Sequence, residues 1–155
     1  PMNSWFYKPR AMLETPSDKV CWIDADCEVL QPLDEIFNYP TSTKMALTKD
    51  LVRPMYWATG VNVIKGRPDI LMRWVERCEN NPKGTRGDQE CLGDLIGIAD
   101  DYIVEMPQEY QWLRLMLDRG YDSSDKKIIH WTGPIGKQHI RQRLMNESKI
   151  YTNTK

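Results

Sequence analysis

Two aspartates, Asp24 and Asp26, stand directly after the apolar segment 19–23. Turn-forming residues bound this segment, which predicts a short buried strand. Ligand sites of open α/β sheets lie at the carboxyl ends of their strands. Because alternate residues of an extended chain point the same way, both carboxylates can reach one point, where two hard oxygen donors favour Mg²⁺ or Mn²⁺. The alternative is a pair of solvated turn aspartates.

A histidine, His130, lies near the end of another predicted strand, over residues 127–131, and Gly133, Gly136 and Lys137 follow it. An imidazole suits Mn²⁺ better than Mg²⁺. A glycine-rich turn lets backbone N–H groups approach a phosphate closely, and a lysine adds a positive charge. The simpler alternative is a hydrogen-bonded surface histidine beside an ordinary turn.

A third local signal is the tripeptide Gly87-Asp88-Gln89, at the start of a predicted helix over residues 88–96. An acidic side chain in the first turn stabilises the positive end of the helix dipole. A helix cap is therefore enough to explain this signal when it is taken alone. The three signals become specific only in combination.

The overall composition excludes several classes of function. Lys and Arg total 21 against 22 for Asp and Glu, a net charge of −1, so we expect no binding of nucleic acid, which requires a basic excess. No apolar run approaches the roughly 20 residues of a membrane span. None of the four cysteines is spaced as C-x-x-C, and no disulfide framework is expected. We expect a cytoplasmic location, with a membrane-tethered parent protein as the open alternative.

Alternating strands and helices must position these residues, which predicts an α/β fold with a mixed sheet. The clearest helix opens at Pro68, because Leu71, Trp74, Val75 and Cys78 share one helical face. We expect one domain over residues 1–147 and a loose tail over 148–155. The other predicted helices cover residues 5–14, 32–37, 88–96 and 138–146, and the predicted strands cover 19–23, 44–48, 60–64, 102–106 and 127–131.

Five sequence blocks in order resemble the nucleotide-sugar-dependent glycosyltransferases of the GT-A fold, around glycosyltransferase families 8, 32 and 34. The blocks are Asp24-Ala25-Asp26 with the turn after it, residues 57–64, Gly87-Asp88-Gln89, residues 106–112, and His130 with Gly133. The resemblance implies a Rossmann-like mixed sheet flanked by helices. Only 23 residues precede Asp24, so part of the N-terminal nucleotide-binding half of that fold is expected to be missing.

The resemblance also implies roles for individual residues. Asp24, Asp26 and His130 would hold Mn²⁺, or Mg²⁺ in its place, and Asp88 and Gln89 would be the catalytic residues beside the sugar. Tyr110, Trp112 and Trp131 would form the acceptor side. The residues implied to bind the donor are Lys8, Asp24, Ala25, Asp26, Gly60, Asp88, Gln89, Gly133 and Lys137.

The activity implied by the resemblance is metal-dependent sugar transfer. A hexose or deoxyhexose would pass from a nucleotide diphosphate donor, such as UDP-glucose or UDP-galactose, to a hydroxyl group of a glycan. The sequence departs from the family pattern at several positions. Ala58 and Gln111 both stand where the family has asparagine, and Lys137 lies one residue further from His130 than is common in family 8.

Two other functions fit part of the sequence. Haloacid-dehalogenase-like phosphatases also place Asp-x-Asp after a buried strand, with the first aspartate as nucleophile, but Glu28 stands where their pattern has Thr or Val. A non-catalytic glycan-binding module would use exposed aromatic side chains, and the chain has six Trp and seven Tyr residues. Phosphatase activity on a generic phosphate ester, or glycan binding without donor cleavage, would distinguish these alternatives.

Overall fold

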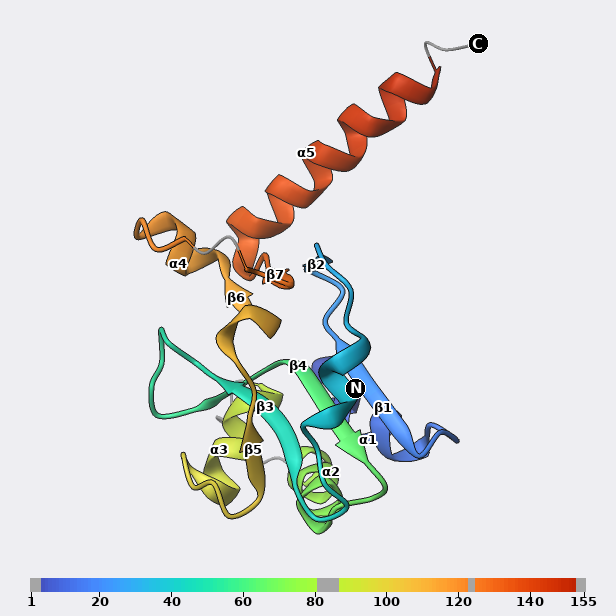
Figure 1. The fold of residues 1–155 in the computed structure, drawn as a ribbon, viewed down its shortest axis with the longest axis vertical. Helices are drawn as coiled ribbons and strands as arrows, with labels where there is room; N and C mark the ends of the chain where they lie inside the picture. Colours follow the sequence, from blue (N-terminus) through green and yellow to red (C-terminus); the bar gives the residue numbers. More distant parts are fainter. Residues whose placement is uncertain (1–3, 81–86, 123–124, 153–155) are drawn as a thin grey trace.

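The computed structural model of the 155-residue chain describes residues 4–80, 87–122 and 125–152. Its fold is α/β, with helices against a mixed sheet (Figure 1). The first sheet has the order β1-β4-β3-β5, in which β5 runs parallel to β3 and the other pairs are antiparallel. The strands of this sheet are β1 (Lys19–Ile23), β3 (Met45–Lys49), β4 (Trp57–Lys65) and β5 (Ile103–Glu105).

A second, smaller sheet continues from the end of the first. Its order is β2-β7-β6, where β2 (Cys27–Val29) and β7 (Ile128–His130) are antiparallel and β6 (Trp112–Leu113) is parallel to β7. The pairing places Cys27 opposite His130. This register brings the segment after β1 beside a strand more than 100 residues later in the chain.

The central strand β4 is the most deeply buried element of the first sheet. Residues 57–64 are all buried, with β1 on one side and β3 on the other. Strand β1 has the predicted bounds, but it is half-buried rather than buried. The reason is its position, because β1 pairs with β4 alone among the described strands and forms an edge of the sheet.

Helices α2 (Asp69–Glu79) and α3 (Asp88–Ile96) begin where the sequence predicts, and the bounds of α3 agree at both ends. The inward residues are also confirmed, since Leu71, Trp74 and Cys78 of α2 pack in one cluster with Cys91 and Leu92 of α3. The Trp74 indole donates a hydrogen bond of 2.8 Å to the backbone oxygen of Asp88. This contact fixes the first turn of α3 against α2.

The N-terminal segment combines a 3₁₀ turn, η1 (Ser4–Tyr7), with helix α1 (Lys8–Glu14). Pro9 lies in the first turn of α1, where the missing N–H group has no intrahelical partner to lose. Phe6 and Met12 join the same core cluster as α2 and α3. The remaining short helices are η2 (Asp34–Asn38), η3 (Gln108–Tyr110) and α4 (Arg114–Asp118).

The last helix, α5 (Gly133–Thr152), is longer than predicted at both ends and projects away from the rest of the molecule (Figure 1). Residues 133–137 open this helix instead of forming a separate glycine turn. Residues 148–152 continue it instead of starting a loose tail, and residues 153–155 lie outside the described part. Pro134 suits the opening of a helix because a first-turn N–H has no partner within the helix.

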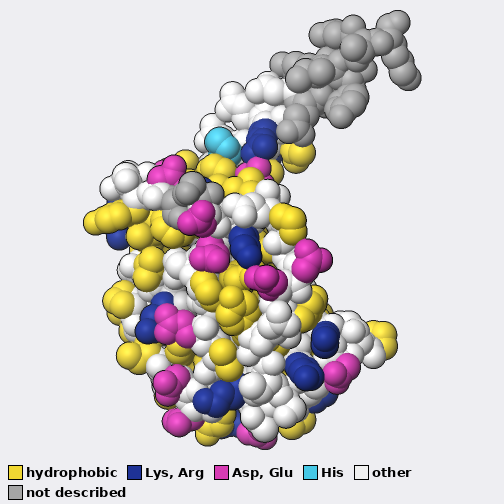
Figure 2. Space-filling view, in the orientation of Figure 1, with side chains coloured by type: hydrophobic (Ala, Val, Ile, Leu, Met, Phe, Trp, Pro, Cys, Tyr) yellow, Lys and Arg dark blue, Asp and Glu magenta, His cyan; other side chains and the backbone are white. Residues whose placement is uncertain are grey.

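The surface bears charges of both signs. Figure 2 shows Lys and Arg side chains interspersed with Asp and Glu over the visible face, as expected from a net charge of −1. Within the described part of the chain, no helix is both long enough and apolar enough to cross a membrane.

Candidate active site

A cavity of about 800 Å³ opens where β1 and β7 end and where α3 and α5 begin. Residues that the sequence singles out from five separate segments line this one space. Among the residues lining it are all the predicted donor and metal residues, namely Lys8, Asp24, Ala25, Asp26, Gly60, Asp88, Gln89, His130, Gly133 and Lys137.

Asp26 and His130 face each other across the β2–β7 pair. The Nε2 atom of His130 lies 3.1 Å from Oδ1 of Asp26, and the backbone N–H of Trp131 donates to the Asp26 carbonyl oxygen at 2.8 Å. Burial acts against ionisation of Asp26. The hydrogen bond and charge from His130, with the charge of Lys137, outweigh burial and lower the pKa of this carboxyl below its ordinary value.

Cys27 also lies at this point, which the sequence reasoning did not foresee. Asp26, Cys27 and His130 each bring one potential ligand atom to within 4.8 Å of the others. The Cys27 thiol lies 4.0 Å from the carbonyl oxygen of Gly60. Burial, followed by the charges of Asp24 and Asp26, raises the pKa of this thiol. This shift keeps Cys27 a thiol at neutral pH, and a hard cation prefers the neighbouring carboxylate and imidazole to a sulfur ligand.

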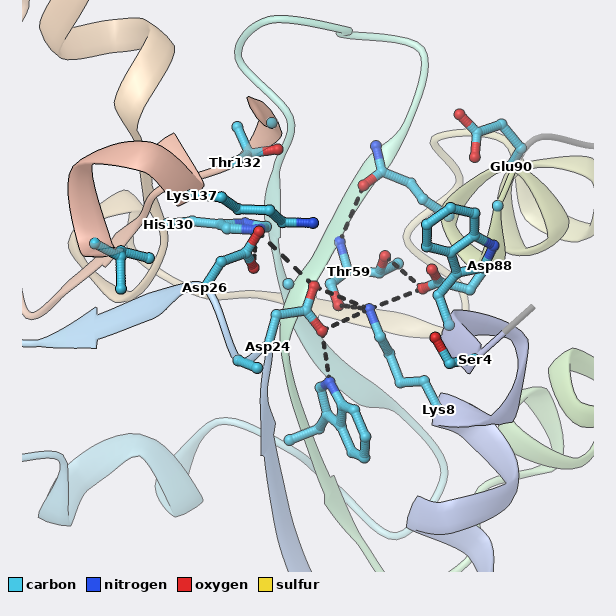
Figure 3. A pocket seen from close by; sticks show the side chains of 18 of the residues that line it. Ser4, Lys8, Asp24, Asp26, Thr59, Asp88, Glu90, His130, Thr132 and Lys137 are labelled. Atoms are coloured by element: carbon cyan, nitrogen blue, oxygen red, sulfur yellow. Dashed lines mark hydrogen bonds and ion pairs between the residues drawn. The ribbon is translucent and has the colours of Figure 1, made fainter. Parts of the chain in front are cut away.

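The ammonium group of Lys8 is buried, with 3% of the residue exposed. It lies 3.0 Å from Asp24 and 2.9 Å from Asp88, and it donates to the carbonyl oxygen of Thr59 at 2.7 Å. Figure 3 shows Lys8 between the two carboxylates. Burial opposes its charge, but Asp88 and Asp24 together raise the pKa of Lys8 above its ordinary value. Lys8 is thus a fixed cation and not a solvated helix charge.

Asp24 has different partners from Asp26, although one residue separates them. Its carboxylate accepts hydrogen bonds from Lys8 and from the Trp22 indole, the latter at 2.7 Å. Its Oδ2 atom lies 3.9 Å from Nε2 of His130. The two carboxylates therefore lie near each other, as the strand geometry predicts, but Lys8 and Trp22 already neutralise and hold the first one.

Asp88 and Gln89 lie on the side of Lys8 that is opposite to Asp24. Asp88 accepts a hydrogen bond of 2.8 Å from the Thr59 hydroxyl. Gln89 accepts from the Thr59 backbone N–H at 3.3 Å and donates to Asp50 at 2.8 Å. Burial raises the pKa of Asp88 above its ordinary value, although the contacts with Lys8 and Thr59 act in the opposite direction.

The sequence patterns did not single out three residues near Gln89, namely Asp50, Arg53 and Glu90, as site residues. Asp50 is 4% exposed and accepts hydrogen bonds from the backbone N–H groups of Val52 and Arg53, both at 2.9 Å. Arg53 lines the cavity and lies 2.7 Å from Glu90, which also lines it. Arg53 belongs to the loop between β3 and β4, and no local pattern there marks a binding residue.

Gly60 leaves the space that the His130 ring fills. A Cβ atom at position 60 would lie 2.4 Å from Nδ1 of His130 and 2.9 Å from the side-chain amide of Gln111. Gln111 is 1% exposed, accepts a hydrogen bond of 2.7 Å from the Val61 N–H, and lies 3.4 Å from the same imidazole. Gln111 is a residue at which the sequence departs from the family pattern, and it packs directly behind His130.

One of the residues predicted for the acceptor side, Tyr110, is not exposed to a ligand. Tyr110 is fully buried, packs edge-on against Tyr39 with ring centroids 5.4 Å apart, and accepts a hydrogen bond from Lys127. It belongs to the core and offers no ring face to a sugar. Trp112 is half-buried and is not among the residues lining the 800 Å³ cavity. Trp131 is half-buried and lines a neighbouring smaller cavity.

Comparison with known proteins identifies the architecture. No protein-family model and no curated protein sequence matches the chain. Solved structures of glycosyltransferases do match it. The structure of the galactosyltransferase LgtC with donor and acceptor sugar analogues superposes with a TM-score of 0.58 at 17% identity, over 83% of this chain. This chain has the GT-A fold.

Two further GT-A structures agree with this assignment. The glycosyltransferase GlyE of Streptococcus pneumoniae gives a TM-score of 0.63 at 18% identity over 86% of this chain. Mouse xyloside xylosyltransferase 1 gives 0.55 at 12% identity over 81%. The chain spans 57% of the LgtC chain, 39% of GlyE and 62% of the mouse protein. The GT-A fold gives the haloacid-dehalogenase-like alternative no structural support.

Proposed function

We propose that this GT-A domain transfers a sugar from a nucleotide diphosphate donor, UDP-linked, to a hydroxyl group of a glycan, with a divalent cation. The observation that carries the proposal is that residues from separate sequence motifs meet at one cavity. Residues from four of the five motif blocks chosen from the sequence, together with Lys8, line one cavity at the end of a GT-A sheet, and only the block at 106–112 is not among the residues lining it. Its volume of about 800 Å³ lies within the range of about 300–1,000 Å³ that is usual for small-molecule sites.

The candidate cation ligands are Asp26 and His130. An ionised carboxylate and an imidazole within 3.1 Å of each other fit Mn²⁺ or a similar borderline cation. Asp24 would act beside them, since Lys8 and Trp22 already hold its carboxylate. Such a cation, when bound, neutralises charge on the departing nucleoside diphosphate.

The first turns of α5 would bind the diphosphate. Gly133 and Lys137 both line the cavity, and the start of a 20-residue helix presents free N–H groups and a positive dipole end. Lys137 is also close enough to Asp26 to help lower the pKa of that carboxyl. The positive charge of Lys137 would therefore act at the same point as the cation.

Asp88 and Gln89 would position the transferred sugar. Both side chains are held by Thr59, and Asp88 is additionally held by Lys8. A carboxylate with a raised pKa suits either orientation of donor hydroxyl groups or removal of a proton from the incoming hydroxyl. Lys8 would position Asp88 and Asp24 relative to each other, in addition to any contact with the donor.

Calorimetric titration of UDP with Mn²⁺, and again with EDTA, tests the proposal. We expect binding that requires Mn²⁺, that is lost in Asp26→Asn, and that remains in Asp69→Asn, a matched change at an exposed carboxylate of α2. Slow metal-dependent release of UDP from a UDP-sugar should accompany it. UDP binding that is indifferent to both metal and Asp26 would contradict the metal assignment. Glycan binding without any donor cleavage would favour the non-catalytic module instead.

A further inference from the structure

The loop between β3 and β4 is held by one buried carboxylate, that of Asp50. This residue comes directly after β3 and is 4% exposed. Its Oδ1 atom accepts hydrogen bonds from the backbone N–H groups of Val52 and Arg53, both at 2.9 Å. Its own N–H donates to the carbonyl oxygen of Tyr56 at 3.2 Å, just before β4 begins. One oxygen of the Asp50 carboxylate therefore fixes the shape of this loop.

The second oxygen of Asp50, Oδ2, binds the first turn of α3. The side-chain nitrogen of Gln89 donates to it at 2.8 Å, and the Nε atom of Arg53 donates at 3.2 Å. A carboxylate offers about four lone pairs, so the four donors fill it. Gln89 lines the 800 Å³ cavity, whereas Asp50 is not among the residues lining it. An effect of Asp50 on a ligand must therefore pass through a neighbour such as Gln89.

The side-chain amide of Gln89 is held at both of its ends. Its oxygen accepts from the Thr59 backbone N–H at 3.3 Å, while its nitrogen donates to Asp50. A carboxylate only accepts hydrogen bonds and a backbone N–H only donates them. A reversed amide would place oxygen against the Asp50 carboxylate and N–H against the Thr59 N–H, and both bonds would be lost. The two partners therefore permit one orientation of this amide.

This orientation decides what Gln89 offers to a ligand. A primary amide has two N–H donors and two acceptor lone pairs, and the bonds to Asp50 and Thr59 use one of each. One further N–H and one further lone pair thus have fixed positions beside the cavity. The Thr59 hydroxyl also holds Asp88, at 2.8 Å. Asp88 and Gln89 are therefore positioned from the same residue, and Asp50 supplies the second support of Gln89.

We infer that Asp50 is a positioning residue for the sugar end of the cavity, because it fixes the direction of the Gln89 amide. The part of this inference that concerns the sugar rests on the proposed function. The described side-chain contacts of Asp50 are to its own loop and to Gln89, not to Asp26 or Lys137. Loss of its acceptor oxygen should therefore impair the step at the sugar and leave diphosphate binding unchanged.

Asp50→Asn tests the orientation selectively. The variant keeps an oxygen for the N–H groups of Val52 and Arg53 and places an NH₂ group opposite the Gln89 amide, so one of the two amide contacts must be lost. The side-chain amide resonances of Gln89, identified by their loss in Gln89→Glu, should shift in this variant. They should stay in place in Asp94→Asn, a matched change at an exposed carboxylate of the same helix. Unchanged Gln89 resonances in Asp50→Asn would overturn the inference.

A double variant tests the polarity of the contact. In Asp50→Asn with Gln89→Glu, the new amide can donate to the new carboxylate, whose other oxygen can still accept from the Thr59 N–H. The net charge is the same as in the unmodified chain. We expect the double variant to have a higher urea midpoint of unfolding than either single variant. Losses that simply add would show that the two side chains are not coupled, and would also overturn the inference.

Donor cleavage tests the consequence at the sugar. The assay is Mn²⁺-dependent release of UDP from UDP-glucose or UDP-galactose, whichever the unmodified chain cleaves faster. Asp50→Asn should lower kcat about 100-fold, the loss typical of a misplacement of about 1 Å, with the Kd of Mn²⁺-UDP unchanged, and Asp94→Asn should change neither. An unchanged kcat despite shifted Gln89 resonances would contradict a role at the sugar. If the unmodified chain neither binds UDP with metal nor cleaves a donor, the proposed function fails, while the resonances and the urea midpoints still decide whether Asp50 orients Gln89.

Discussion

The Nζ atom of Lys8 lies 2.9 Å from Oδ2 of Asp88, although 80 residues separate the two in the chain. Lys8 begins α1 and Asp88 begins α3, so the contact joins the starts of two helices. The same ammonium lies 3.0 Å from Asp24. One buried cation therefore connects the carboxylate that follows β1 with the carboxylate proposed to contact the sugar.

Replacing Lys8 should destabilise the protein strongly. Lys8→Met leaves Asp24 and Asp88 without their shared cation, and removing one member of a buried ion pair costs about 3–5 kcal/mol. We expect a loss of that size in the free energy of unfolding, measured by urea denaturation. Lys49→Met is the control, because the Lys49–Glu105 pair is about half exposed and should contribute less than about 1 kcal/mol. Equal losses in the two variants would contradict a structural role for Lys8.

A methyl group at position 60 should weaken cation binding. In Gly60→Ala the new Cβ would lie 2.4 Å from Nδ1 of His130, so the imidazole must move. Displacing a metal ligand through its surroundings typically costs about 10–100-fold in affinity, which Mn²⁺ titration followed by electron paramagnetic resonance would measure. Gly93→Ala is the control, since its Cβ would meet the Tyr56 ring at 2.5 Å, away from His130. That variant should lose stability and keep its Mn²⁺ affinity.

Substitution of Gly136 should also be unfavourable, but for a different reason than substitution of Gly60. Its Cβ would lie 2.0 Å from the backbone oxygen of Trp131, and the backbone cannot rotate away as a side chain can. Gly136→Ala should therefore shift α5 relative to β7, cost about 1–3 kcal/mol of stability, and weaken pyrophosphate binding through displacement of Lys137. Gln138→Ala, at an exposed position two residues later, should change stability by less than about 0.5 kcal/mol. Unchanged pyrophosphate affinity in Gly136→Ala would argue against a phosphate site at the start of α5.

The thiols should react slowly at neutral pH. Burial raises the pKa of Cys21 to about 11, and the pKa values of Cys27, Cys78 and Cys91 are raised as well. At pH 8 only about one Cys21 in a thousand would be the reactive thiolate. Alkylation of Cys21 by iodoacetamide, followed by mass spectrometry, should accelerate about tenfold per pH unit between pH 8 and 10.

The urea-unfolded chain is the control for this reactivity. Its thiols have ordinary pKa values, so its alkylation rate should level off above about pH 9. Because the folded state holds the Cys21 proton more tightly than the unfolded state, folding stability from this group is complete below about pH 9 and is lost as the pH rises toward 11. Native thiols that react at pH 8 as fast as unfolded ones would contradict burial of these side chains.

Local patterns predicted the regular elements well. The apolar run of β1 and the helical periodicity of α2 and α3 depend on neighbouring residues, and their bounds or starts agree with the structure. The start of α5 at Gly133 could not be predicted, because Gly133 and Gly136 are poor helix formers. Close packing of Gly136 on the Trp131 carbonyl group, which only a residue without a side chain allows, accompanies the early start of this helix.

The membership of the candidate site was predictable, but its internal contacts were not. Asp26, Asp88 and His130 come from three of the sequence blocks that carry the family resemblance, and all three line one cavity, as the resemblance implied. The burial of Lys8 depends on contacts 16 and 80 residues away, and Cys27 reaches the site through the β2–β7 register. The prediction that Tyr110 faces the acceptor was wrong, because nothing in its short segment indicates that this side chain is buried in the core.

Three consecutive residues of β4 contact groups on both sides of the candidate site. Thr59 binds Lys8, Asp88 and Gln89, while Gly60 accepts the Asp24 N–H and makes room for His130. The next residue, Val61, is held by Gln111. The spacing between His130 and the proposed sugar-binding carboxylate is therefore set by three consecutive buried residues of one strand. A donor with a longer or shorter bridge between sugar and nucleoside should therefore bind more weakly, because a buried strand paired on both sides fixes the distance between these two points.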